Sequence, residues 1–61
     1  MSKLTSKELS AIEDQLGAEH LLITKYRMAS GNVSDKTLSS TCEKIANKHQ
    51  EHYDRLLSYL K

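Results

Sequence analysis

The sequence predicts an all-α protein whose two helices fold back on each other as an antiparallel hairpin. Two long stretches place apolar residues at alternating spacings of three and four, which is typical of one face of a helix. The chain contains no proline and only two glycines, Gly17 and Gly31, so few positions interrupt a helix. The clearest break lies near the middle of the 61 residues. These observations favour a single helical-hairpin domain over residues 1–61.

The first helix is expected to cover about residues 6–30. Thr5 and Glu8 match a capping box, in which the two residues exchange side-chain and backbone hydrogen bonds at a helix start. Gly31 and Asn32 tolerate a left-handed conformation and are therefore expected to form the C-cap. The predicted inward stripe consists of Leu9, Ile12, Leu16, Glu19, Ile23, Tyr26 and Ser30.

The second helix is expected to cover about residues 35–60. Ser34 or Asp35 can serve as its N-cap, since both side chains accept a hydrogen bond from the first helical turn. With about four residues between the helices, the chain must reverse its direction and pack the helices antiparallel. The second stripe consists of Leu38, Cys42, Ile45, His49, His52, Leu56 and Tyr59.

A second copy of the chain is expected to complete the core. A domain of this length buries only about 60% of the surface that its unfolded chain exposes, so a disulfide, a metal or a partner chain is needed. The single cysteine, Cys42, cannot form an intrachain disulfide. We therefore predict a homodimer in which two hairpins form a four-helix bundle. The apolar faces are also wider than one partner helix can cover, because they include Leu22, Ala29, Ala46, Tyr53 and Leu60.

Composition argues against several classes of function. Nine basic and eight acidic residues interleave along the chain and give a net charge of +1, which does not favour a nucleic-acid surface. The longest apolar run, residues 21–23, is far shorter than the roughly 20 residues of a membrane span. The sequence shows no apolar segment typical of a signal peptide, and a lone cysteine fits a reducing compartment. We therefore expect a cytoplasmic protein without nucleic-acid or membrane partners.

Three ligand-capable residues interrupt the middle of the apolar stripes: Glu19 on the first helix, and His49 and His52 on the second. A carboxylate in a dry core costs several kcal/mol unless it is paired, and the imidazoles beside it also need partners. The three-residue spacing places both rings on one helix face, about one turn apart. A divalent transition metal, zinc or iron, would satisfy all three side chains, so these residues are the predicted metal ligands.

An alternative interpretation is that these residues are hydrogen-bonded core residues that set the helix register. The predicted turn places Glu19 opposite Ala46. His49 would then be displaced along the helix axis by roughly 4.5 Å and His52 by roughly 9 Å. The second gap would require a bridging ion, helix tilt or ligands from the partner subunit.

Three further side chains near the stripes are predicted not to bind the metal directly. His20 is expected at the surface or rim, where hydrogen bonding to a ligand is its functional option. Glu13 is expected to be a surface charge. Cys42 lies two turns before His49 and is expected to be a small buried hydrophobic residue.

Several motifs resemble ferritin-like proteins. Ala18-Glu19, with Tyr26 seven residues after the glutamate, is similar to the first helix of rubrerythrin-type proteins, and residues 49–56 are similar to the second. The layout resembles even more closely the short bacterial spore coat proteins of the Coat F type. The motifs of that resemblance are Leu-Thr (4–5), Glu-Asp-Gln-Leu (13–16), Ala-Glu-His-Leu-Leu (18–22), Ser-Asp (34–35), Lys-His-Gln-x-His-Tyr (48–53) and Leu-x-x-Tyr-Leu (56–60).

The resemblance implies a ferritin-like four-helix bundle in which Glu19 and His52 correspond to metal ligands of the family. His49 stands where the family has the second glutamate of its bundle half. A two-fold dimer would thus offer two carboxylates and four imidazoles in place of four carboxylates and two imidazoles. This set suits zinc or another late divalent ion at least as well as a di-iron pair, and it disfavours ferroxidase or peroxidase chemistry. A spore-coat location, with other coat proteins as partners, is also implied.

Three functions are compatible with the sequence. The one we favour is a metal-binding structural protein, similar to spore coat components, in which the ion secures a homodimeric bundle. The second is a ferritin-like di-iron oxidase, peroxidase or metal-handling protein. The third is a metal-free helical interaction module. The sequence contains no nucleophile–base set, phosphate-binding loop or cofactor motif, so no catalytic residue is predicted and an enzyme is not favoured.

Overall fold

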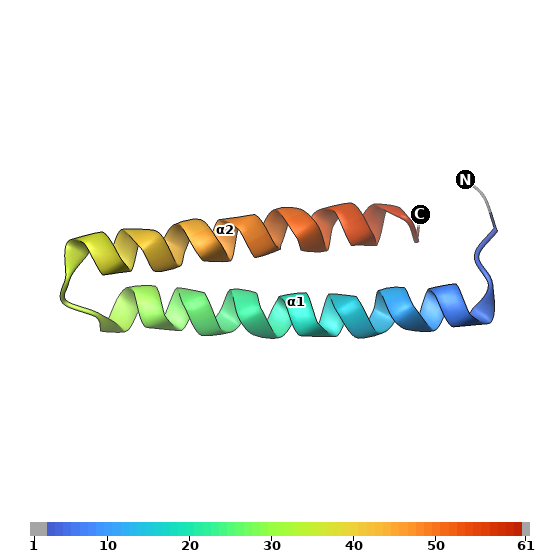
Figure 1. The fold of residues 1–61 in the computed structure, drawn as a ribbon, viewed down its shortest axis with the longest axis horizontal. Coiled ribbons are helices and arrows are strands. Elements are labelled where there is room, and N and C mark those ends of the chain that lie inside the picture. The colour runs from blue at the N-terminus through green and yellow to red at the C-terminus, as the bar shows by residue number, and fades with distance from the viewer. Residues whose placement is uncertain (1–2, 61) are drawn as a thin grey trace.

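The computed structural model describes residues 3–60 as two antiparallel helices joined by a short turn (Figure 1). Helix α1 comprises Ser6–Asn32, and helix α2 comprises Lys36–Ser58. The hairpin is long and thin, with dimensions of 46 × 16 × 11 Å. The two helices lie side by side along their length, with the turn at one end and the start of α1 and the end of α2 at the other (Figure 1). The predicted all-α hairpin is confirmed.

Helix α1 begins with the predicted capping box. The backbone N–H of Thr5 donates to Glu8 Oε1 at 2.9 Å, and the backbone N–H of Glu8 donates to Thr5 Oγ1 at 3.1 Å. Both bonds satisfy donors that have no partner inside the helix. The sequence therefore located this helix start correctly.

The predicted left-handed C-cap of α1 is wrong. Gly31 and Asn32 are both helical, Val33 follows in an extended conformation (φ −99°, ψ 138°), and no residue from 3 to 60 adopts a positive φ. Carbonyl groups at a helix C-terminus need partners from outside the helix. Here the hydroxyl of Ser39 in α2 donates to the Ser30 carbonyl at 2.7 Å. A side chain from the other helix, and not a left-handed glycine, therefore supplies a hydrogen-bond donor to the end of α1.

Helix α2 begins at an Asp35 cap and ends slightly earlier than predicted. The backbone N–H of Leu38 donates to Asp35 Oδ1 at 2.9 Å, which selects Asp35 over Ser34 as the N-cap. The helix ends at Ser58, and the next two residues form a turn in which the Tyr59 N–H donates to the Leu56 carbonyl at 3.1 Å.

The longer α1 changes the register between the helices. The connection consists of residues 33–35, so its centre is Ser34. Glu19 lies fifteen residues before this centre and His49 fifteen residues after it. His49, and not Ala46 as predicted, is therefore opposite Glu19. The predicted displacement of the two histidines fails because it assumed a turn centred earlier in the chain.

The core of one hairpin is small. Only Ile23, Cys42 and Ala46 are buried apolar residues within the described chain, with exposed fractions of 6%, 8% and 0%. Cys42 is thus the small buried residue that the sequence predicted. Large apolar side chains remain open to solvent, including Leu38 at 50% and Tyr59 at 52%. Neither helix includes a stretch that is both long enough and apolar enough to cross a membrane.

Candidate metal centre

Glu19 supplies a buried carboxylate at the middle of α1. Thirteen residues of the helix precede it and thirteen follow it. It is only 5% exposed and is the single buried charged residue among residues 3–60. It occupies a core position because it continues the stripe that includes Leu16 and Ile23. Such a group requires partners inside the protein, since water cannot solvate it.

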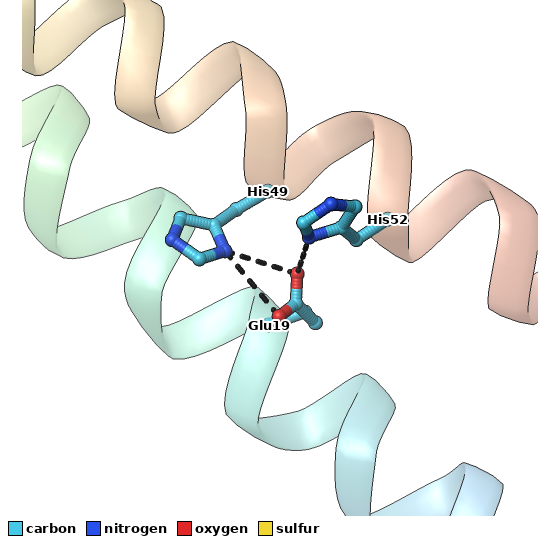
Figure 2. Close-up of side chains that lie close together, drawn as sticks. All are labelled: Glu19, His49 and His52. Carbon is cyan, nitrogen blue, oxygen red and sulfur yellow. Dashed lines mark hydrogen bonds and ion pairs between the residues drawn. The ribbon is translucent and has the colours of Figure 1, made fainter.

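Those partners are the two histidines of α2, both of which point toward the carboxylate (Figure 2). His49 Nδ1 lies 3.1 Å from Glu19 Oε2 and 3.3 Å from Oε1, and His52 Nδ1 lies 3.4 Å from Oε2. The three-residue spacing on α2 brings both rings to one face, as predicted. His52 needs neither a bridging ion nor a partner subunit to reach Glu19, because the register differs from the predicted one.

The geometry of the cluster fits a metal ion. Each of Glu19, His49 and His52 offers a ligand atom that lies within 4.8 Å of the other two. Zinc binds nitrogen and oxygen ligands at about 2.0–2.2 Å, so neighbouring donors around a tetrahedral ion lie roughly 3.4 Å apart. The closest carboxylate-to-ring distances, 3.1 Å and 3.4 Å, match this separation. One carboxylate and two imidazoles can therefore hold a divalent transition metal at the centre of the hairpin.

The electrostatics of the cluster favour an ionised carboxylate. Burial by itself raises the pKa of Glu19. The hydrogen bond with His49, the charges of His49 and His52 and the hydrogen bond from Gln15 together outweigh burial, so the pKa lies below its ordinary value. Glu19 is consequently an anion at neutral pH, the form in which a carboxylate binds metal.

The buried polar atoms of the cluster also have hydrogen-bond partners without an ion. Within the part of the chain that the structure describes, every buried side-chain nitrogen or oxygen has a hydrogen-bond partner. A neutral imidazole can donate from Nδ1 to the carboxylate and leave its other nitrogen as an acceptor. The interpretation of these residues as register-setting core groups is therefore also consistent with the geometry.

Two neighbours orient the ligand side chains. Gln15 Nε2 donates to Glu19 Oε1 at 3.4 Å, and the ring of Tyr26 stacks on His49 with centroids 6.1 Å apart and an interplanar angle of 16°. Gln15 was not among the candidate residues of the sequence analysis. Its position four residues before Glu19, on the same helix face, was the available signal.

The remaining candidates lie outside the cluster. His20 is exposed and its ring lies 6.3 Å from that of Tyr53, so it is a surface residue beside the site, as predicted. Glu13 is also exposed. These two residues provide matched non-ligand positions for experiments on the cluster.

Comparisons of the chain with protein-family models, with curated proteins and with solved structures give no match.

Proposed function

We propose that this chain is a metal-binding structural protein in which Glu19, His49 and His52 hold a divalent transition metal at the centre of a homodimeric four-helix bundle. The observation that carries the proposal is the buried carboxylate of Glu19 between two imidazoles, with all three ligand atoms within 4.8 Å of one another. An ion there would replace weak contacts by metal–ligand bonds that join α1 to α2.

The small core gives the metal a clear role. A ligand that binds only the folded state adds RT ln(1 + [L]/Kd), which is about 2.7 kcal/mol at a hundredfold excess over Kd. Small domains have a total stability of the order of 5 kcal/mol. A hairpin with three buried apolar residues in its described part has little other means of joining its helices. The ion would therefore contribute a large share of the folding free energy.

The donor set favours zinc over an iron pair. Two imidazoles and one carboxylate per chain give four nitrogen and two carboxylate ligands per dimer. Imidazole suits zinc and other late divalent ions, whereas di-iron sites use more carboxylate ligands. The resemblance to Coat F proteins supports a role in a spore coat beside other coat proteins, and it is the basis for that part of the proposal.

Elemental analysis tests the metal site directly. The protein is purified without added metal, and its metal content is measured together with its mass in solution. His49→Leu and His52→Leu should remove the metal, whereas His20→Leu should retain it because His20 lies outside the cluster. Equal metal content in all four proteins, or none in the wild type after zinc loading, would overturn the proposal.

Iron loading separates a structural site from a di-iron enzyme. We expect the wild type to consume oxygen poorly after addition of ferrous iron, because the site has too few carboxylates for a di-iron pair. Rapid and repeated iron oxidation that disappears in His52→Ala would instead favour the ferritin-like oxidase.

A further inference from the structure

One side of α1 carries a line of apolar residues, three of them alanines, that α2 leaves wholly or partly exposed. Successive residues of an α-helix are rotated by about 100°, so Ala11, Ala18, Leu22 and Ala29 lie along one line of the helix. Ala11 and Ala18 are exposed, and Leu22 and Ala29 are half-buried. Glu19 and Ile23 are buried and therefore mark the direction of α2. This line of residues, which we call the alanine line, therefore lies to one side of the surface with which α1 contacts α2.

Helix α2 carries a corresponding line of larger residues. Leu38, Ile45, His52 and Tyr59 recur every seven residues and so share one side of the helix. Leu38 and Tyr59 are about half exposed, and the His52 side chain is 46% exposed. The bulky line of α2 is thus also left open by the contact between the helices.

The two lines lie on the same side of the hairpin. A hollow of about 360 Å³ near the termini is lined by Leu4, Glu8, Ala11, Ile12, Leu56 and Tyr59, and so joins both lines. We call this side the open face and define it by the alanine line of α1 and the bulky line of α2. Viewed from the N-terminus of its own helix, each line is rotated in the same sense away from the contact between the helices. Because α1 and α2 are right-handed and run antiparallel, this shared sense of rotation places both lines on the same side of the hairpin.

The opposite side of the hairpin is polar near the turn. Arg27 Nη2 donates across the helices to Gln50 Oε1 at 3.4 Å. A hollow of about 460 Å³ there is lined by Arg27, Ser30, Gly31, Glu43 and Asn47. Burial of this side would remove the charged side chains of Arg27 and Glu43 from water, which is costly, so the open face is the better contact surface.

The metal cluster reaches the surface at the open face. Glu19 is buried and His49 is 23% exposed, whereas His52 belongs to the bulky line and is the most exposed of the three ligands. One chain supplies three donors, one fewer than the four of a closed structural zinc site. A donor from outside the chain would enter at this edge.

We infer that the open face is the surface on which a second copy of this chain docks, and that docking closes the metal cluster at its His52 edge. This inference rests on the homodimer of the proposed function and specifies its contact surface. Glu19 lies at the midpoint of α1, so a two-fold axis beside the cluster aligns the full length of both hairpins. A partner without that symmetry would not place its own metal ligands there.

Size and shape are consistent with a self-complementary contact. The hairpin measures 46 Å by 16 Å, which corresponds to a footprint of roughly 740 Å². A standard stable interface buries about 800 Å² per partner. Small residues on α1 and large residues on α2 offer alternating volumes that can interdigitate, and a net charge of +1 produces little repulsion between copies.

Thiol labelling of adjacent residues tests the inference. In a Cys42→Ala background, Ala18→Cys places a thiol on the open face, and Gly17→Cys places one on the outward side, where nothing lies within 4 Å of an added Cβ. Both positions are exposed in a single hairpin, so both variants should fold, which helical circular dichroism checks. Alkylation rate and mass are measured for both proteins over a range of concentrations, with zinc bound.

The thiol of Ala18→Cys should become protected as dimer forms. When about nine-tenths of the chains are dimeric, its labelling should fall about tenfold because only the monomer reacts. Gly17→Cys should label at an unchanged rate. If Ala18→Cys is monomeric at concentrations at which Gly17→Cys is dimeric, that result would also support the open face as the contact surface.

Equal labelling of both thiols in a dimer of the expected mass would overturn the inference and leave the metal proposal intact. A monomer that holds zinc at every concentration would overturn both the contact surface and the dimer. A dimer that protects the thiol of Ala18→Cys but binds no zinc at neutral pH would overturn both the proposed metal site and its closure by the second copy. The same result would still support the open face as the contact surface.

Discussion

Two of the places where polar side chains cross between the helices, the turn end and the middle, differ in what they require. At the turn end, the hydroxyl of Ser39 donates to the Ser30 carbonyl at 2.7 Å, and the two hydroxyls lie 3.2 Å apart. This neutral pair is satisfied by its own atoms. At the middle, Glu19 brings a buried negative charge that is stable only beside a positive group, a donated proton or an ion. The comparison shows why only the central contact is a candidate metal site.

The most severe test adds a second negative charge to the core beside Glu19. Leu16→Asp places a second carboxylate one turn before that of Glu19, at a half-buried position. We expect a loss of about 2–4 kcal/mol of folding free energy, which is enough to abolish both the fold and the dimer. Circular dichroism and sedimentation measure the two losses. Leu21→Asp is the matched control, because Leu21 is 68% exposed and the change should leave the fold intact.

Removal of the metal tests whether an ion supports the central contact. A chelator should remove about 2.7 kcal/mol from a protein held at a hundredfold excess of metal over Kd. For a domain of this size, that corresponds to a fall in melting temperature of about 10–20 °C. The measurement is thermal unfolding followed by circular dichroism with and without chelator. An unmoved melting curve at neutral pH would show that the cluster acts only as a hydrogen-bonded network.

Acidification should act on the metal-loaded protein in two steps. Imidazole must be neutral to bind metal, and a free ring has a pKa of about 6.5, so metal affinity and its share of stability should fall first. The second step lies below the ordinary carboxyl range. The pKa of Glu19 is lowered in the folded state, so its stabilising effect is present above the unfolded value and is lost as the pH falls through the lowered pKa.

Metal-free protein should show the second step alone. The pKa of Glu8 is also lowered, by the hydrogen bonds from the backbone N–H and then the hydroxyl of Thr5. The stability that ionised Glu8 contributes is therefore lost over the same acidic range. Glu8→Gln removes this contribution and serves as the control. Denaturant unfolding at several pH values measures both steps. Identical losses with and without metal between pH values of about 7 and 5.5 would contradict the assignment of the first step to metal release.

Leucine substitutions in the cluster should separate the charge from the packing. His49→Leu removes a ligand and also restores an apolar core position, so the packing gain should offset part of the lost metal energy. Its melting temperature should not respond to chelator and should lie between those of metal-loaded and metal-free wild type. A variant with leucine at Glu19, His49 and His52 should be stable without metal. A strong response of that variant to chelator would place the metal elsewhere.

The smallest effect is expected at the neutral pair. Ser39→Ala removes the hydroxyl that bonds the Ser30 carbonyl and should cost about 1 kcal/mol. The metal content should not change, because this contact is far from the cluster along the hairpin. Ser40→Ala is the matched control, since Ser40 is exposed and adjacent. Denaturant unfolding and elemental analysis of both variants measure these outcomes.

Local sequence patterns determined the helices, most of their caps and the residues of the cluster. The capping box of Thr5 and Glu8 and the cap at Asp35 depend on contacts within four residues, which a linear sequence records. Helical periodicity alone grouped Glu19 with His49 and His52, since all three continue the apolar stripes. The thin core was also foreseeable, because a 61-residue chain cannot enclose a large one.

Only the tertiary structure decided how the two helices align. Helix α1 continues through Gly31 and Asn32, and the Ser39 hydroxyl, from the other helix, satisfies the Ser30 carbonyl. With α1 ending at Asn32 and α2 beginning at Lys36, the turn is centred on Ser34 and His49 is level with Glu19, so that both rings reach the carboxylate directly. Tyr26 joins the site for the same reason, because its ring stacks on that of His49 in the other helix. The register of a hairpin depends on contacts across the turn, between residues that the local pattern of either helix treats separately.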